Sequence, residues 1–313
     1  MVRLPLRGVA RFCIVLLALA AAASHAECPG SLAVQVLGSG GPRTESARAS
    51  SGYLIWIDGR SRALIDAGGG TFVRFGESGA AVRDLEFVFL THLHADHAAE
   101  LPALLKSAYF SPRRRALTLI GPTAGGSYPD LEGFLSGLFG TQGAFRYLGG
   151  YLDGSDGLFR LERVTLDAEH KQPGSIEPRG GMALTAMGVT HGPVPALALR
   201  VELGGGVVVF SGDQNGDDPA FERLAQGADV LIMDYAVPED AGPVARNLHA
   251  LPSEIGRIAH GADVRHLVLS HLMPRSENAL AASLAGIRKH YNGPISVARD
   301  LTCIDVVAAD QQR

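Results

Sequence analysis

Thr91-His92-Leu93-His94-Ala95-Asp96-His97 is the stretch that decides the fold of this chain. It places three imidazoles and one carboxylate in a single short segment, directly after the apolar run of residues 85–90. Neutral imidazole nitrogens and carboxylate oxygens are the ligands that suit zinc and neighbouring divalent ions. Because packing gives no reason to crowd four such groups together, the stretch predicts a metal site and not a solvated polar turn.

The stretch falls at a predicted junction between a strand and a helix. Residues 85–90 form a continuous apolar run that predicts a buried strand, and apolar residues recur with helical spacing from 98 to 109. Such a junction suits catalysis because the backbone turns sharply there while the elements on both sides stay rigid.

The pattern His-x-His-x-Asp-His after a buried strand resembles the signature of the metallo-β-lactamase superfamily. The resemblance implies an α/β fold, the αββα four-layer sandwich, in which two sheets pack face to face with helices outside and metals at one edge. It also implies three more ligands further along the chain. These are a histidine after the next group of strands, a bridging aspartate at the end of a strand, and a last histidine late in the chain.

The chain has all three residues in that order. His191 lies between two strand-like runs, Asp213 follows residues 207–212, and His271 follows residues 267–270. The resemblance then implies two divalent metal ions, with Zn²⁺ as the first expectation and manganese or iron as alternatives. One ion would be held by His92, His94 and His191 and the other by Asp96, His97 and His271, with Asp213 bridging both.

Two ions in such a site can share a hydroxide and polarise a substrate oxygen, and zinc lowers the pKa of bound water towards ~7. The resemblance therefore implies hydrolysis by a metal-bridging hydroxide, with Asp96 and Asp213 among the catalytic residues. Asp66 matches a family position that orients the histidine stretch from behind. The alternative for Asp66 is a turn residue that ends a strand before three glycines.

The sequence around the bridging aspartate also indicates a branch of the superfamily. True β-lactamases generally lack this aspartate, so the Ser-Gly-Asp that ends at Asp213 favours an ester-cleaving branch. Residues 37–42, Leu-Gly-Ser-Gly-Gly-Pro, and residues 270–275, Ser-His-Leu-Met-Pro-Arg, most resemble the ribonuclease Z and zinc-dependent arylsulfatase group.

In the ribonuclease Z group, a histidine steered by an acidic residue protonates the leaving group. His249 matches that histidine, and Asp234 stands where the group usually has glutamate. The resemblance therefore implies catalytic roles for both, although the shorter aspartate puts its reach to His249 in question. The alternative is that Ser253-Glu254 begins a helix and His249 lies in the loop before it.

The N-terminal segment predicts export. Three arginines precede the apolar residues 12–23, and Ser24-His25-Ala26 offers small residues at the two positions that a signal peptidase reads. The apolar stretch is short for a membrane span. We therefore expect residues 1–26 to be a signal peptide and residues 27–313 to be one hydrolase domain, periplasmic or secreted, without a membrane anchor.

Export leaves two cysteines in the mature chain, Cys28 and Cys303 near its two ends. In an oxidising compartment this even pair favours a disulfide, and two unpaired buried thiols are the alternative.

Apolar residues show no clear periodicity in residues 110–175. This predicts an irregular connection between two halves of the fold. Arg113-Arg114-Arg115 is typical of a solvated charge run, or of a patch that steers an anion. The Gly-rich and aromatic residues 134–151 predict a helix and loop that either cover the metals or only pack against the core.

Net charge separates the candidate substrates. The chain has 28 Lys and Arg against 32 Asp and Glu, a net charge of −4, and loss of the three arginines of the signal peptide makes it −7. Proteins that grip long nucleic acids usually present a basic surface, so long nucleic acid is expected to be a poor candidate and a small anionic ester the preferred substrate.

These patterns together predict an exported dinuclear hydrolase that cleaves a phosphodiester or an aryl sulfate ester. The alternatives are a ribonuclease Z-type endonuclease, a hydrolase of carbonyl esters or lactones with β-lactamase activity less favoured, and a non-catalytic zinc-binding protein. A homodimer is compatible with the sequence, which leaves the oligomeric state open.

Overall fold

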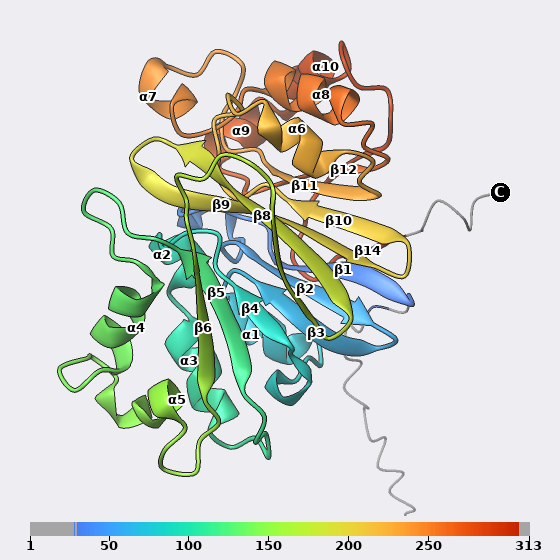
Figure 1. Ribbon diagram of the computed structural model, residues 1–313. Coiled ribbons are helices and arrows are strands. Elements are labelled where there is room, and N and C mark those ends of the chain that lie inside the picture. The colour runs from blue at the N-terminus through green and yellow to red at the C-terminus, as the bar shows by residue number, and fades with distance from the viewer. Residues whose placement is uncertain (1–27, 29, 307–313) are drawn as a thin grey trace, which may run out of the picture.

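The computed structural model describes residue 28 and residues 30–306 as two seven-stranded sheets packed face to face, with helices on both outer faces (Figure 1). This arrangement confirms the predicted αββα sandwich. The segment predicted to be a signal peptide, residues 1–26, lies outside the described residues.

The first sheet begins as an antiparallel meander and continues as parallel strands. Strands β1 to β3 pair antiparallel, and β3 to β6 pair parallel, with β14 added antiparallel beside β1. Its order is β14 (Cys303–Asp305), β1 (Leu32–Gly38), β2 (Gly52–Ile57), β3 (Arg60–Ile65), β4 (Phe87–Phe89), β5 (Leu117–Pro122) and β6 (Leu161–Leu166).

The second sheet repeats this plan. Strands β7 to β10 pair antiparallel and β10 to β13 pair parallel. Its order is β13 (Ile295–Val297), β12 (Leu267–Ser270), β11 (Val230–Asp234), β10 (Gly206–Phe210), β9 (Val194–Leu203), β8 (Met182–His191) and β7 (Gly174–Arg179).

Helices of each half cover the sheet of that half (Figure 1). The first set is α1 (Thr71–Glu77), α2 (Ala95–Ala98), α3 (Leu101–Ala108), α4 (Leu131–Phe139) and α5 (Gly150–Asp153). The second set is α6 (Ala220–Ala225), α7 (Pro243–Arg246), α8 (Pro252–Gly261), α9 (Pro274–Asn278) and α10 (Leu280–Ile287). Short 3₁₀ helices are η1 (Thr44–Ser46), η2 (Val82–Asp84) and η3 (Arg146–Leu148).

Alternation along the strands divides the core into layers. On β1, Val34 and Val36 pack in the cluster that contains the second sheet, whereas Ala33 and Leu37 pack with α1, α3, α4 and α5. Successive strand residues point to opposite faces, so a strand that is apolar at every position must be covered on both sides. The continuous apolar runs in the sequence therefore correspond to the buried middle layers.

The prediction of an irregular stretch at residues 110–175 is wrong, although the helix and loop expected within residues 134–151 are present. The stretch contains β5, α4, η3, α5 and β6, and Leu135, Phe139 and Tyr151 are buried in the core beneath the first sheet. These side chains therefore pack against the core and do not cover the candidate metal site. The parallel pairing of β5 with β4 and β6 joins segments far apart in sequence, which local patterns do not report.

Arg113 departs from the predicted solvated charge run, because its side chain is buried. Its Nη1 donates to the carbonyls of Val82 and Leu85, at 3.0 and 2.7 Å, and its Nε donates to the carbonyl of Arg115 at 2.9 Å. Arg113 is thus a structural residue that holds η2 against the turn before β5, while Arg114 remains exposed.

The expected disulfide between Cys28 and Cys303 is confirmed. It joins the residues before β1 to β14, and the two strands are also paired directly. Among the described residues, no helix is both long enough and apolar enough to cross a membrane.

Candidate metal centre

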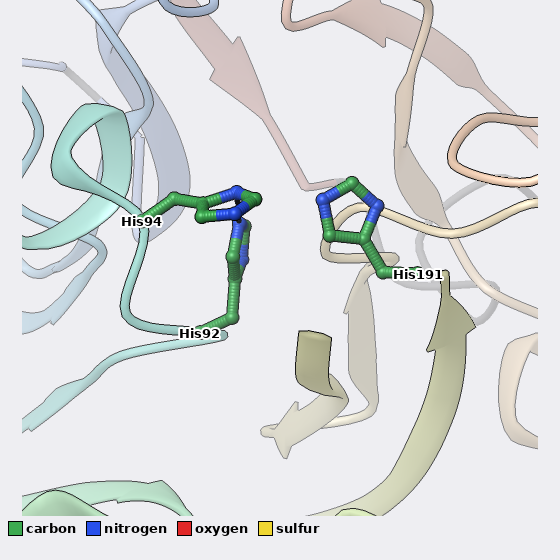
Figure 2. A group of neighbouring side chains, drawn as sticks. All are labelled: His92, His94 and His191. Carbon is green, nitrogen blue, oxygen red and sulfur yellow. Dashed lines mark hydrogen bonds between the residues drawn. The ribbon is translucent and has the colours of Figure 1, made fainter. Parts of the chain in front are cut away.

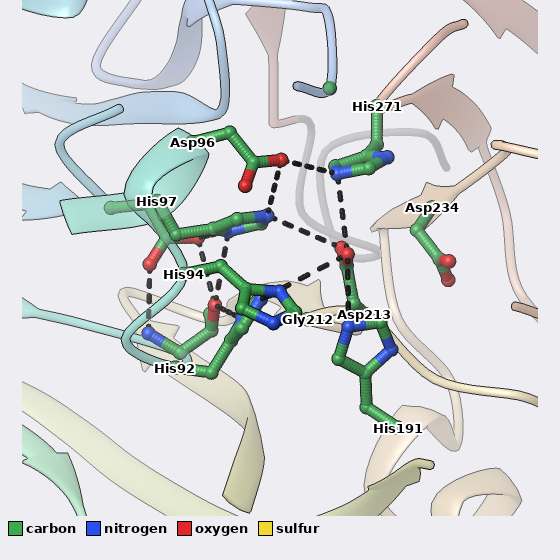
Figure 3. Close-up of polar contacts among 12 residues, drawn as sticks. His92, His94, Asp96, His97, His191, Gly212, Asp213, Asp234 and His271 are labelled. Atoms are coloured by element: carbon green, nitrogen blue, oxygen red, sulfur yellow. Dashed lines mark hydrogen bonds and ion pairs between the residues drawn. The ribbon is translucent and has the colours of Figure 1, made fainter. Parts of the chain in front are cut away.

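The predicted ligands come together at one edge of the sandwich (Figure 3). The histidine stretch follows β4, His191 is the last residue of β8, Asp213 follows β10, and His271 follows β12. The carboxyl ends of β4, β8, β10 and β12 all reach this edge, so residues distant in sequence become neighbours. The expected helix at residues 98–109 is divided into α2 and α3, and α2 already begins at Ala95.

Three histidines form the first group of candidate ligands (Figure 2). His92 and His94 extend from the loop after β4 and face His191 from the second sheet. The His92 Nε2 and His94 Nδ1 atoms are 3.1 Å apart, and one nitrogen from each of the three rings lies within 4.8 Å of the others.

Asp96, His97 and His271 form the second group. The His271 Nε2 atom lies 3.2 Å from Asp96 Oδ2, and the His97 Nε2 atom lies 3.6 Å from the same oxygen. His271 has a left-handed backbone with φ of 55°, a conformation that non-glycine residues rarely adopt. The strain turns the chain sharply at the end of β12, where the ligand is needed.

Asp213 lies between the two groups. Its Oδ2 is 3.2 Å from His271 Nε2 and 3.7 Å from His191 Nε2, and its Oδ1 is 3.5 Å from His97 Nε2. The preceding Gly212 has φ of 59°, and a Cβ there would lie 2.4 Å from the Leu197 carbonyl oxygen. Glycine is therefore required for the turn that presents Asp213.

The seven residues fit a pair of divalent ions. The His97 Nε2, His191 Nε2 and Asp213 Oδ1 atoms are buried and have no hydrogen-bond partner among the described residues. A buried polar atom without a partner costs about 1–3 kcal/mol, and these three all point into the same cluster. Imidazole and carboxylate are also the donor set that zinc accepts.

Buried partners fix the orientation of several ligands. Asp66 Oδ2 accepts from His97 Nδ1 at 2.8 Å, and Asp66 Oδ1 accepts from the Thr91 N–H at 2.8 Å. His191 Nδ1 donates to the Leu248 carbonyl at 2.8 Å. In each case one ring nitrogen is engaged, so the other faces the cluster, which is the usual arrangement around a metal-binding histidine. The structure places Asp66 as the family position implies.

His249 and Asp234 form a buried pair beside the first group. The His249 Nδ1 and Asp234 Oδ2 atoms are 2.8 Å apart, so the shorter aspartate does reach the histidine. The His249 ring centroid lies 5.2 Å from that of His191. The structural alternative is also correct, because α8 begins at Pro252 and His249 lies in the loop before it.

Burial and neighbouring charges set the protonation of the cluster. Burial is the largest effect at His92 and places its pKa well below the ordinary value, and burial lowers the pKa of His249 to about 4. Burial opposes the charge of Asp213, but the imidazoles of His271 and His97 outweigh it and hold its pKa well below the usual range. Burial disfavours charge on His97 and His271, but the Asp213 carboxylate outweighs it and raises the pKa of both rings. Metal binding requires neutral imidazole, so an ion at this position would displace the protons of these two rings.

Sequence patterns did not indicate every residue of the site. Tyr128 places its hydroxyl 3.1 Å from His94 Nε2, and Thr91 Oγ1 lies 3.1 Å from His92 Nδ1. Tyr128 belongs to a loop rich in glycine, serine and proline, where no periodicity marks a contact with a distant histidine.

Comparisons with known proteins identify relatives of this chain. A family model described as a beta-lactamase superfamily domain matches residues 61–272. Ribonuclease Z of Pseudomonas putida strain GB-1 is 29% identical over 300 residues, covering 84% of this chain and 93% of that protein. Ribonuclease Z of Methanosarcina mazei is 28% identical over 306 residues, covering 88% and 98%.

Solved structures share the fold. The metallo-beta-lactamase fold protein YhfI of Bacillus subtilis has a TM-score of 0.66 at 23% identity, covering 88% of this chain and 99% of that one. The short form of human tRNase Z also has a TM-score of 0.66, at 19% identity, with the same coverage of 88% and 99%.

The expectation that long nucleic acid is a poor candidate substrate is wrong. Relatives that match most of this chain are named ribonuclease Z, and a structure with the same fold is named for transfer RNA. The expectation rested on the net charge of the whole chain, which does not report the charge beside the reacting atoms.

Proposed function

The chain belongs to the β-lactamase superfamily, and from this premise we propose that it is an exported, two-metal hydrolase of phosphodiester bonds, with RNA among its candidate substrates. The observation that carries the proposal is the position of Asp213, whose carboxylate lies within 3.7 Å of nitrogens from His191 and His271. A carboxylate shared between two groups of ligands is the arrangement expected for a pair of ions. When bound, two ions would activate water near neutral pH and compensate charge on the reacting oxygens.

The chain's own residues would protonate the leaving group. Because Asp234 engages Nδ1 of His249, the Nε2 atom of His249 is left to face a bound substrate. Cleavage of a phosphodiester leaves an alkoxide, which departs poorly until it gains a proton. His249 would donate that proton from Nε2 as an imidazolium, with Asp234 holding the ring through Nδ1. Burial lowers the pKa of His249 to about 4 in the ligand-free protein, so the negative charge of a bound phosphodiester would have to favour the protonated ring. A positioned acid of this kind contributes roughly 10²–10⁴ in rate.

A pocket lined mainly by residues that follow His271 in the chain suits an anionic substrate. It has a volume of about 260 Å³ and is lined by Arg43, Met273, Pro274 and Arg275. The Arg275 Nε donates to the Ala236 carbonyl at 2.8 Å, which fixes the guanidinium and leaves both Nη groups for other partners. The Gly41 N–H donates to the Leu272 carbonyl at 3.1 Å, so the loop that carries Arg43 lies beside the chain after His271.

Arg43 is already paired with Glu45, so Arg275 is the guanidinium left for an anion. Guanidinium groups bind phosphate and sulfate oxygens in the same forked geometry. The pocket therefore supports an anionic ester without separating phosphodiesters from aryl sulfates. The names of the relatives favour phosphodiesters, and aryl sulfate hydrolysis is the second candidate.

Export is the remaining part of the proposal. The Cys28–Cys303 disulfide supports it, because disulfides persist in oxidising compartments and are rare in the reducing cytosol.

The test compares substrates on one preparation of mature, zinc-loaded protein. We would measure turnover of a precursor transfer RNA, bis(para-nitrophenyl) phosphate, para-nitrophenyl sulfate and a lactone, with Asp213→Ala as the background. Phosphodiester turnover well above this background is the expected result. Turnover of the sulfate or the lactone alone would overturn the phosphodiesterase assignment, and turnover of none would leave a metal-binding protein without catalysis.

A further inference from the structure

Of the three histidines in the first group, His94 is oriented by a loop that local sequence did not connect with the site. His92 contacts Thr91, the residue before it, and His191 donates to the Leu248 carbonyl, and both of these rings are buried. The His94 ring is only half-buried, and among the described residues its one hydrogen-bond partner beyond the cluster is the hydroxyl of Tyr128.

The geometry at His94 assigns a role to each ring nitrogen. Its Nδ1 lies 3.1 Å from His92 Nε2, so Nδ1 is the atom directed at the shared ligand position. Its Nε2 lies 3.1 Å from the Tyr128 oxygen, which is able to accept the Nε2 proton. A neutral histidine has one protonated nitrogen, so a hydrogen bond from Nε2–H to Tyr128 leaves Nδ1 unprotonated and available to bind a metal.

The loop that carries Tyr128 is well fixed. Gly125 and Tyr128 exchange backbone hydrogen bonds, at 3.2 and 3.0 Å, to form a tight hairpin. After the hairpin, Asp130 caps α4 by accepting from the Gly133 N–H at 2.7 Å. A rigid loop can hold a hydroxyl at a defined point more accurately than a mobile one.

The same hairpin contacts the second half of the sandwich. A Cβ added to Gly125 would lie 2.7 Å from Pro195 Cγ, so the hairpin lies directly against β9. Pro195 pairs with Thr190 of β8, the residue before His191. The hairpin thus touches the strand pair that presents His191 and, through Tyr128, also holds His94.

We propose, on the basis of the two-metal function proposed above, that Tyr128 is a positioning residue that sets the metal affinity of the His92, His94 and His191 position. The hairpin of residues 125–128, called here the Tyr128 hairpin, aligns ligands from both halves of the sandwich. The second position, at Asp96, His97 and His271, has its own support in Asp66 and does not depend on the hairpin.

The test is a metal titration of Tyr128→Phe, which removes only the hydroxyl. Loss of a hydrogen-bond partner behind a metal-binding histidine weakens metal affinity by about 10–100-fold. We expect one zinc ion to bind the variant as tightly as it binds the wild type, and the other to bind about 10–100-fold more weakly in competition with a chelator. The titration would be repeated with cobalt(II), whose absorption differs between the two positions. The spectra would show which position fills later in the variant than in the wild type.

Two further variants test whether the effect comes from the Tyr128 hydroxyl and the position of its hairpin. Tyr147→Phe removes a hydroxyl from a side chain that is 60% exposed in η3, and it should leave both affinities unchanged. Gly125→Ala keeps Tyr128, but its added methyl group pushes the hairpin away from Pro195. It should therefore weaken binding of the same ion as Tyr128→Phe does. Thermal melts of the metal-free proteins would verify that each variant is folded.

Wild-type affinity at both positions in Tyr128→Phe would overturn the proposal, and so would an equal loss at both. If the wild-type protein itself bound no zinc, the two-metal function would fail as well. Loss confined to the His92, His94 and His191 position in the variant, against two ions in the wild type, supports both, whereas loss confined to the other position would overturn the proposal.

Discussion

At the scale of single residues, His249 has the most specific proposed role, which is to protonate the leaving group. It contacts Asp234 through Nδ1 and lies beside His191, so its second ring nitrogen is the one that the proposed proton transfer to the leaving oxygen would use. An acid matters only when the leaving group needs a proton. The dependence of the rate on the leaving group therefore separates this role from a general effect on the site.

The first prediction concerns His249→Ala. The kcat should fall by roughly 10²–10⁴ for a dinucleotide, whose leaving group is an alkoxide, and by much less for bis(para-nitrophenyl) phosphate, because nitrophenolate departs without a proton. Steady-state kinetics on both substrates measures the difference. His260→Ala, which changes an exposed histidine of α8, is the control. Equal losses on the two substrates would show that His249 is not the acid.

Asp66 gives a second prediction at this scale. It accepts hydrogen bonds from His97 and from the Thr91 N–H, so it orients a ligand of the second group. Asp66→Asn should weaken the ion at Asp96, His97 and His271 by about 10–100-fold, and it should affect the other ion less, because Asp66 reaches His92 only through the Thr91 hydroxyl. Competition with a chelator measures it, and a loss confined to the three-histidine position would contradict the assignment.

The seven candidate ligands were predictable from sequence, whereas their partners were not. His92 to His97 lie within one stretch, and Asp213 and His271 each follow a recognisable apolar run. Tyr128 contacts His94 only because a hairpin from a different part of the chain lies above it. A motif reports residues that share a local pattern, and it is silent on contacts that the tertiary fold creates.

At the scale of elements, the strand ends were predicted more accurately than the connections. The run before His271 corresponds to β12, and the run before Asp213 to β10, although Asp213 lies three residues beyond that strand. Residues 110–175 were misjudged because β5 and β6 are parallel neighbours and α4 is short and contains glycines. Such elements are stabilised by tertiary packing and not by their own periodicity.

The buried Arg113 supplies a prediction for this scale. Arg113→Met should lower the free energy of unfolding by about 3 kcal/mol, because the Val82 and Leu85 carbonyls lose their donor inside the protein. Arg114→Met, which changes the exposed neighbour, should alter it by no more than about 0.5 kcal/mol. Urea unfolding of both variants measures this. If both variants changed the free energy of unfolding by similarly small amounts, Arg113 would belong to a solvated charge run after all.

At the scale of the whole molecule, the fold explains how an acidic chain can act on an acidic substrate. A net charge of −4 is a sum over all surfaces, and it led to the wrong expectation about nucleic acid. The pocket with Arg43 and Arg275 is lined mainly by residues that follow the candidate ligand His271 in the chain. Two ions at the candidate site would add further positive charge. Local potential, more than total charge, governs which substrate reaches the site.

The disulfide gives a prediction for the entire chain. Cys28 and Cys303 are separated by 275 residues, so the bond restricts nearly the whole unfolded chain. The double variant Cys28→Ser and Cys303→Ser should lose about 2–5 kcal/mol of stability while it keeps its metal affinity, because neither cysteine is among the candidate ligands. Denaturant unfolding and zinc titration measure the two properties. A loss of zinc affinity would show that β1 and β14 support the site more directly than proposed.

The central claim is that Asp213 bridges two metal ions held by ligands from both halves of the sandwich. Anomalous diffraction at the zinc edge, from crystals of the zinc-loaded protein, tests it most directly. The account predicts two peaks on opposite sides of the Asp213 carboxylate, one at His92, His94 and His191 and the other at Asp96, His97 and His271. A single peak, or zinc that does not contact Asp213, would contradict it.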